Sequence, residues 1–308
     1  MAKRDLISML DVEEDLIGLL ELALTVKRRL KAGEAYEPLR GRTLGMIFEK
    51  ASTRTRVSFE VGMTQLGGHA VYLNPQDTQL GRGETIADTA RVLSRYVDGI
   101  MFRAFRHEDM VELAKGASVP VINGLDDREH PCQIISDLLT VLERRGKLEG
   151  LRFTYVGDGN NVAHSILLGG AVAGMAVTVA TPKGFEPDRH MTALAREAAE
   201  RHGGRVHVTN DPREAAEGAD VLYTDVWVSM GMEKEKESRM QAFRGFALDE
   251  ALIGLANPDV LVMHCLPAHR GLEISDGAMD GPHSIVFDQA ENRLHAQKAI
   301  LARFLAGA

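Results

Sequence analysis

The sequence is poor in cysteine, with only Cys132 and Cys265 among its 308 residues. Two cysteines are too few for a disulfide framework or a thiolate zinc site, and this scarcity predicts a reducing, cytoplasmic setting. Positive charge is also scarce, because 36 lysines and arginines face 44 aspartates and glutamates, for a net charge of −8. Nucleic-acid binding needs basic clusters and is therefore disfavoured. Any bound anion must be held by locally concentrated positive groups.

The N-terminal residues lack a continuous apolar stretch and include early acidic residues, so we expect no secretory signal. Residues 159–182 contain no Asp, Glu, Lys or Arg, and a membrane helix needs about 20 apolar residues. However, Asn160, Asn161 and His164 interrupt this stretch, and it ends in an alternating pattern. We therefore predict a buried helix followed by a buried strand, and no membrane span.

Short β-rich runs alternate with helical patterns along the whole chain. The expected strands are 43–50, 69–73, 98–105, 119–123, 151–157, 176–181, 205–209, 220–226, 259–266 and 284–288. The expected helices between the first strands are 56–66, 84–96 and 108–117. This alternation predicts parallel sheets covered on both faces, and the length suggests two domains. The predicted fold class is α/β, with two doubly wound parallel-sheet domains joined by interdomain helices.

The helical pattern after residue 133 divides the two predicted domains. The expected limits are 1–133 for the first domain, completed by a C-terminal helix at 290–308, 134–149 for an interdomain helix, and 150–289 for the second domain. Near the N-terminus, Asp11 is expected to cap a helix, with Glu14 three residues later completing a capping box.

Unusual polar clusters follow the predicted strands at the points where they end. Ligands of open parallel sheets bind beyond the carboxyl ends of the strands, so these clusters are the candidate site. The clusters are 51–56, 74–83 with Gln79, Arg103, 127–133, 157–161, 225–232 and 264–267. Their concentration at strand ends is the main functional signal in the sequence.

The first cluster has the composition of a phosphate site. Ser52, Thr53, Arg54 and Thr55 lie between a strand and a helix, where unpaired N–H groups, hydroxyls and a guanidinium suit phosphate. The alternative is an ordinary helix cap with solvated arginines. Arg103, His130 and Thr55 together would stabilise an oxygen that gains negative charge. The competing interpretation is that His130 has a purely structural role.

The residues around His130 have separate expected roles. Pro131 constrains His130 toward an extended conformation, and Cys132 is expected to face the core. Gln133 can both donate to and accept from an amide-like group.

Gly157-Asp158-Gly159 raises the question of a dinucleotide site. The motif lacks a third glycine, and the next strand ends without the acidic residue that would hold a ribose. An oxidoreductase is therefore disfavoured. A non-catalytic two-domain amino-acid-binding protein remains as a third class, although it would not need the phosphate cluster.

Two segments of the second half carry the remaining candidates. The loop with Asp225, Ser229 and Met230 precedes a charged run at 233–239, which alone indicates a solvated segment. His264-Cys265 ends an apolar strand, but no further ligand lies at metal-binding spacing, so we expect no metal. Cys265 could be a nucleophile, and we interpret it instead as a substrate contact.

Four motifs together resemble the ornithine carbamoyltransferase family, in the same order and over essentially the whole chain. They are Ser52-Thr53-Arg54-Thr55-Arg56, His130-Pro131-Cys132-Gln133, Asp225 with Ser229-Met230-Gly231, and His264-Cys265-Leu266-Pro267. The first two resemble all carbamoyltransferases, including the aspartate enzymes. The last two resemble the ornithine branch.

The resemblance implies a role for each candidate residue. It implies that the phosphate of carbamoyl phosphate is bound by Ser52, Thr53, Arg54 and Thr55, with Gln79 reaching in from a neighbouring subunit. It implies that Arg103, His130 and Thr55 polarise the carbonyl, and that Arg293, Gln133 and the backbone of Cys265 and Leu266 hold the carbamoyl group. It implies ornithine contacts from Asn161, Asp225, Ser229 and Met230.

The activity implied is carbamoyl transfer from carbamoyl phosphate to the δ-amine of L-ornithine, giving L-citrulline and phosphate for arginine biosynthesis. The resemblance implies no cofactor and a homotrimer with shared active sites, or a larger assembly of trimers. Carbamoylation of another amine, such as putrescine or an acylated ornithine, is the alternative.

Overall fold

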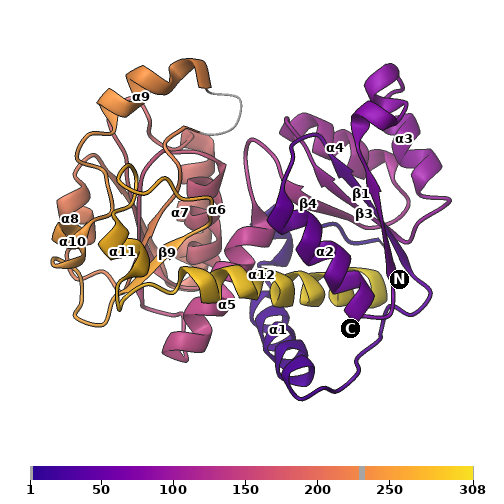
Figure 1. Cartoon of the computed structure of the whole chain (residues 1–308), viewed down its shortest axis with the longest axis horizontal. Helices are drawn as coiled ribbons and strands as arrows, with labels where there is room; N and C mark the ends of the chain where they lie inside the picture. The colour runs from indigo at the N-terminus through magenta and orange to yellow at the C-terminus, as the bar shows by residue number, and fades with distance from the viewer. Residues whose placement is uncertain (1–2, 229–232, 308) are drawn as a thin grey trace. The chain divides into compact units, whose positions relative to one another are not determined.

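The computed structural model describes residues 3–228 and 233–307. The chain divides into two compact units, Met1–Leu139 with Glu291–Ala308, and Thr140–Ala290 (Figure 1). Each unit contains one parallel β-sheet, so the predicted fold class is confirmed. The domain limits drawn from the sequence stay a prediction.

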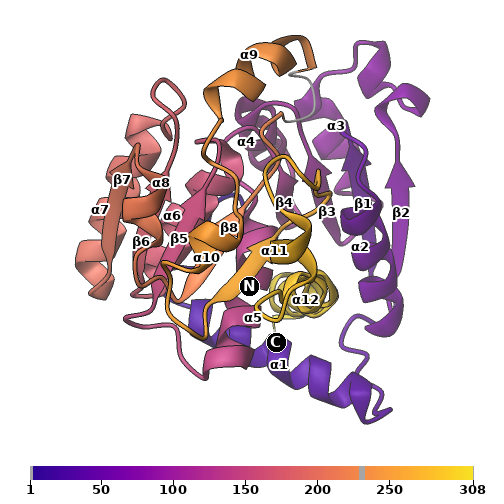
Figure 2. The ribbon, with the colours of Figure 1, turned by 60° about the vertical axis from the view of Figure 1, so that its left-hand side comes forward.

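The sheet of the first unit has the strand order β2-β1-β3-β4 (Figure 2). Its strands are β1 (Thr43–Phe48), β2 (His69–Leu73), β3 (Gly99–Arg103) and β4 (Val121–Leu125). Phe48 pairs with Arg103, and Arg103 pairs with Leu125 across a register shift. Because the strands are parallel, the residues that follow β1, β3 and β4 all emerge at one edge of the sheet.

Helices connect these strands and supply the rest of the first unit's core. They are α1 (Leu16–Lys31), α2 (Thr53–Gln65), α3 (Ile86–Leu93), α4 (His107–Gly116) and the start of α5 (Pro131–Arg145), with short 3₁₀ turns η1 (Met9–Val12), η2 (Pro75–Asp77) and η3 (Leu80–Arg82). The C-terminal helix α12 (Val286–Leu301) continues into a π-helical turn, η5 (Ala302–Ala306). Hydrogen bonds from Lys27 to Asn292 and from Lys298 to Gln65 tie α12 to α1 and α2.

The expected cap at Asp11 is wrong. Ser8 caps η1, and Asp11 is the third residue of that turn, where its carboxylate accepts from the main chain of Ser8. Helix α1 begins later, after Asp15, whose side chain makes no capping hydrogen bond. The sequence contains several acidic residues in succession here, so spacing alone did not select the right one.

The sheet of the second unit has the strand order β7-β6-β5-β8-β9 (Figure 2). Its strands are β5 (Arg152–Val156), β6 (Ala176–Ala180), β7 (Arg205–Thr209), β8 (Val221–Thr224) and β9 (Leu261–His264). The helices of this unit are α6 (Asn161–Val172), α7 (Arg189–His202), α8 (Pro212–Ala216), α9 (Lys236–Ala242), α10 (Glu250–Ile253) and α11 (Asp276–Asp280), with the turn η4 (Glu233–Glu235).

The uncharged stretch from residue 159 forms the buried helix α6 followed by strand β6, as predicted. Every residue of α6 after Asn161 is buried, which explains why no charge occurs there. Within the described residues, no helix is long and apolar enough to cross a membrane.

The predicted strand at 284–288 is wrong, because α12 begins at Val286 and only Ser284 bridges to β9, opposite Val262. A short apolar run suits a buried helix start as well as a strand, so periodicity could not separate them. Helix α5 also begins earlier than expected, at Pro131, where proline's missing N–H costs nothing in a first helical turn.

The packing of α6 on β6 allows a stability test with two glycines. A Cβ added at Gly170 of α6 would lie 2.4 Å from Cγ2 of Val177, whereas a Cβ at Gly62 of α2 would meet its nearest atoms at 3.5 Å. We predict that Gly170→Ala destabilises the fold by about 1–3 kcal/mol through overpacking. We predict that Gly62→Ala is neutral or stabilising by up to about 1 kcal/mol, since alanine favours helix. Urea unfolding followed by circular dichroism measures both, and equal stability of the two variants would contradict this packing.

Candidate functional site

The first residues of α2 form the first part of the candidate site. Ser52 caps the helix, accepting from the Thr55 N–H at 3.3 Å and donating to the Thr55 hydroxyl at 3.0 Å. Thr53 is exposed, Arg54 is half-buried and Thr55 is buried. The N–H groups of a first helical turn have no partners within the helix, and they carry its positive dipole end. This segment therefore offers anion-binding donors.

Arg293 of α12 connects α2 to α5. Its guanidinium donates through Nη2 to the Thr55 hydroxyl at 3.1 Å and through Nη1 to Oε1 of Gln133. The Gln133 amide in turn donates to Asp137 at 2.8 Å. Arg293 is only 4% exposed, so a buried positive charge lies directly beside the helix start.

His130 lies in the field of several cations. It is buried, and burial together with the charges of Arg293, Arg103 and Arg54 holds its pKa well below the ordinary value. A neutral imidazole can donate from one nitrogen without adding to the positive charge. The structure thus brings together Arg54, Arg103, His130 and Arg293 in the first unit, with Thr55 bonded to one of them.

Other predicted residues of this unit are placed differently. The thiol of Cys132 is fully buried and donates to the Asn123 carbonyl, and burial raises its pKa to about 12. It faces the core, so any contact of this residue with a ligand would come from its main chain. Pro131 begins α5, and Gln79 is exposed just before η3. The role of Gln79 in a neighbouring subunit stays a prediction.

The sequence analysis did not single out Lys50. It lies two residues after the end of β1, and burial and the nearby charge of Arg103 lower its pKa. Its ammonium lies 5.0 Å from the centre of the Phe105 ring. The sequence could have indicated Lys50 by its position one residue before the polar cluster at 51–56. Lys50 adds another cation near Arg103.

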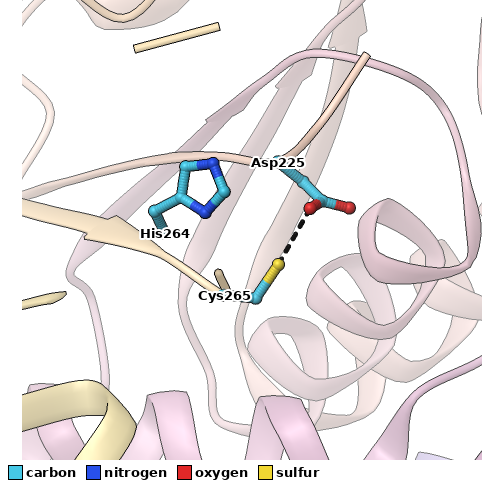
Figure 3. A group of neighbouring side chains, drawn as sticks. All are labelled: Asp225, His264 and Cys265. Atoms are coloured by element: carbon cyan, nitrogen blue, oxygen red, sulfur yellow. Dashed lines mark hydrogen bonds between the residues drawn. The ribbon is translucent and has the colours of Figure 1, made fainter. Parts of the chain in front are cut away.

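Asp225 is the centre of the candidate site in the second unit. It directly follows β8, is buried, and accepts from the Asn160 amide at 3.1 Å and from the Cys265 thiol at 2.9 Å (Figure 3). Asn160 also caps α6, of which Asn161 is the first residue. The Cys265 thiol therefore lies directly beside this carboxylate, and its role as a substrate contact stays a prediction. The predicted residues Ser229 and Met230 lie outside the described residues.

Arg239 is a further residue that the sequence did not reveal. It lies in the charged run interpreted as solvated, yet it is buried and donates to Asp158 at 2.8 Å and to the Trp227 carbonyl at 3.1 Å. Burial raises the pKa of Asp158, and the charge of Arg239 opposes this rise. The pair joins the end of β5 to the segment after Asp225.

Asp225, His264 and Cys265 have possible ligand atoms within 4.8 Å of one another (Figure 3). However, both ring nitrogens of His264 are engaged, Nδ1 by the Leu266 N–H at 2.8 Å and Nε2 by Glu273 at 3.2 Å. A metal ligand needs a free lone pair on nitrogen. These three residues therefore do not fit a metal centre in this arrangement.

The two units thus offer complementary chemistry, with an anion site at the start of α2 in one and a buried carboxylate with amide and thiol neighbours in the other. These features are typical of a protein that binds an anionic reactant in one unit and a cationic group in the other.

Comparisons with known proteins agree with this class. Residues 4–143 match the family model "Aspartate/ornithine carbamoyltransferase, carbamoyl-P binding domain", and residues 149–304 match the "Asp/Orn binding domain" of the same family. The chain belongs to the aspartate/ornithine carbamoyltransferase family, so the resemblance in the motifs is confirmed.

Individual relatives cover the chain from end to end. It is 58% identical over 306 residues to the ornithine carbamoyltransferase of Methanoculleus marisnigri, covering 99% of this chain and 98% of that protein. It is 53% identical to a catabolic ornithine carbamoyltransferase of Thermoplasma acidophilum, covering 99% of each. The solved structure of ornithine carbamoyltransferase from Pyrococcus furiosus superposes with a TM-score of 0.96 at 54% identity, covering 100% of this chain and 98% of that one.

Glu129 gives a pH-dependent test of the segment that carries His130. Its buried carboxyl accepts from the Met9 N–H at 3.0 Å, and burial raises its pKa from 4.5 to about 7. Because the pKa of this carboxyl is higher in the folded than in the unfolded protein, its contribution to stability is fully present below its unfolded pKa. That contribution is lost as the pH rises through its folded pKa. We predict that Glu129→Gln stabilises the fold by roughly 3 kcal/mol above pH 7 and has little effect near pH 4.5.

Thermal unfolding at a series of pH values measures this difference. Exposed Glu200 of α7 provides the control, because Glu200→Gln should shift the melting temperature little at any pH. A stabilisation by Glu129→Gln that does not grow with pH would contradict the buried environment of this carboxyl.

Proposed function

We propose that this chain transfers the carbamoyl group of carbamoyl phosphate to the δ-amino group of L-ornithine, giving L-citrulline and phosphate. The observation that carries the proposal is that Arg54, Arg103 and Arg293 all lower the pKa of buried His130, which directly precedes α5, while Arg293 also bonds Thr55 in the first turn of α2. The family and the names of the similar proteins support the same reaction.

Carbamoyl phosphate is bound by the first unit. Its phosphate accepts from the first turn of α2, through Ser52, Thr53 and Thr55, and from the guanidinium groups of Arg54 and Arg103. An acidic protein of net charge −8 needs such a local excess of positive charge to attract a dianion. Gln79 of a neighbouring subunit completes the phosphate contacts in this proposal.

The carbamoyl group has its own set of donors and acceptors. Arg103, His130 and Thr55 donate to the carbonyl oxygen, which gains negative charge during attack, and the low-dielectric surroundings strengthen these bonds. Gln133, held by Arg293, and the main chain of Cys265 and Leu266 hold the carbamoyl NH₂. Pro131 and Cys132 contribute through the backbone that positions His130 and Gln133.

Ornithine is bound by the second unit. The buried carboxylate of Asp225 accepts from the α-ammonium, and Asn161 donates to the α-carboxylate, with further contacts from Ser229 and Met230. An acylated ornithine has no α-ammonium for Asp225, and putrescine has no α-carboxylate for Asn161. L-Ornithine is therefore the acceptor that satisfies both charged ends of the proposed site.

The chemistry is direct attack. The δ-amine loses its proton, because an alkylammonium of pKa about 10.4 has no lone pair with which to attack. Its nitrogen adds to the carbonyl carbon, the C–O bond to phosphate then breaks, and phosphate leaves with the bonding electron pair and takes up the second proton that the attacking nitrogen loses. No covalent enzyme intermediate is needed, and most of the acceleration comes from positioning and preorganised charge.

We further propose that the protein is a homotrimer with shared active sites and that it works in arginine biosynthesis in the cytoplasm. One similar protein is named catabolic. Expression of this gene in an arginine auxotroph tests whether the enzyme works in the biosynthetic direction, because growth without arginine requires citrulline formation. Light scattering coupled to size exclusion tests the trimer.

Substitution of Arg54 tests the function and the phosphate site together. We predict that the purified protein forms citrulline and phosphate without any nucleotide, and that Arg54→Ala lowers kcat/KM for carbamoyl phosphate by about 10³-fold or more. Arg56 of the same helix is the matched control, because its side chain pairs with Glu60 at 3.0 Å and stacks on Tyr72. Near-normal activity of Arg54→Ala, or an equal loss in Arg56→Ala, would contradict the phosphate assignment.

A further inference from the structure

The main chain directly after β9 has an unusual conformation. Leu266 has a φ of +58°, in the left-handed region where the Cβ of a residue other than glycine meets its own carbonyl oxygen. Such a conformation persists only where its surroundings determine it. The structure therefore has to supply an interaction that holds this residue in place.

His264 supplies that interaction. The Leu266 N–H donates to Nδ1 of His264 at 2.8 Å, so Nδ1 carries a lone pair and no proton. The ring proton must then be on Nε2, which donates to Oε1 of Glu273 at 3.2 Å. His264 is thus fixed as the neutral tautomer protonated at Nε2. Figure 3 shows its ring beside Cys265.

Glu273 holds the imidazole of His264, and Gln289 holds the main chain of the same residue. Glu273 is 1% exposed, and its Oε1 also accepts the His269 N–H. Burial would raise the pKa of this carboxyl, but the hydrogen bonds from His264 and His269 outweigh burial and keep it lowered. The His264 N–H donates to the buried Gln289 amide at 2.9 Å. The carboxylate thus remains an acceptor and selects the tautomer.

The hydrogen bond to Leu266 also fixes the preceding carbonyl. The Cys265 C=O and the Leu266 N–H belong to one planar trans peptide unit, in which they point to opposite sides. Because the N–H is directed at the His264 ring, the Cys265 carbonyl is directed away from it. Loss of the acceptor at Nδ1 would remove this hydrogen bond, which orients the peptide.

We propose that His264 is a positioning residue whose Nδ1, selected as an acceptor by Glu273, orients the Cys265–Leu266 peptide so that its carbonyl accepts from the carbamoyl NH₂. The inference rests on the proposed function, because it takes carbamoyl phosphate as the ligand of that carbonyl. His264 itself touches no reacting atom and takes no proton during the reaction.

Two amide substitutions separate this role from simple packing. Asn at position 264 places its amide where Nδ1 lies and retains an acceptor for the Leu266 N–H, whereas Gln places its amide near Nε2 and retains only the contact with Glu273. We expect His264→Asn to keep kcat/KM for carbamoyl phosphate within about fivefold of the wild type, and His264→Gln to lower it about 10- to 100-fold. The KM for ornithine should change little in either variant.

The outcomes are distinguishable from a failure of the proposed function. A wild-type protein that makes no citrulline would refute the function. With an active wild type, equal losses in both variants, or a larger loss in His264→Asn, would overturn the positioning role. Melting temperatures provide the control, since a structural role alone would make the loss of activity follow the loss of stability.

A second pair of variants at Glu273 applies if the histidine variants do not fold. Glu273→Gln keeps an acceptor for the Nε2 proton, whereas Glu273→Met has a similar length and removes it. We expect the Met variant to lose about 10-fold in kcat/KM for carbamoyl phosphate and the Gln variant to remain within about threefold of the wild type. Equal activity of these two variants would overturn the inference.

Discussion

The repulsion between three arginines around one buried histidine is the constraint on which this site depends. Arg54, Arg103 and Arg293 all act on His130, which stays neutral because burial and these charges oppose its protonation. Placing these like charges together is unfavourable until an anion binds. The part of α12 from Glu291 onward belongs to the first unit, where its Arg293 bonds Thr55 and Gln133. The fold therefore concentrates positive charge in a region suited to a dianion.

The second unit carries charges of the opposite sign at the corresponding sheet edge. Asp225 and Asp158 both follow strands and are both buried. Arg239 neutralises Asp158, whereas Asp225 accepts from the Asn160 amide and the Cys265 thiol. One unit thus suits an anionic donor and the other a zwitterionic acceptor, which is what transfer between carbamoyl phosphate and an amino acid requires.

The sequence revealed most of the strands and the candidate residues because parallel sheets place strand ends at one edge. That rule needs only strand positions, and it selected Ser52, Arg103, His130 and Asp225 as candidates directly. It failed where a side chain acts across a long sequence distance or where burial is not visible in composition. Arg239 looked solvated among charged neighbours, and the start of α12 at Val286 looked like a strand. The partners of His264, namely Glu273 and Gln289, lie on other segments and cannot be inferred from spacing.

In the proposed function each unit binds one of the two reactants, and a single bisubstrate compound tests this most directly. The compound joins a phosphonate, through a methylene and a carbonyl, to the δ-nitrogen of L-ornithine, and calorimetry measures its affinity. We predict binding about 10³-fold or more tighter than phosphate or ornithine alone. We also predict that Arg103→Met in the first unit and Asp225→Asn in the second each weaken it at least about 10-fold. Unchanged affinity in either variant would contradict the claim.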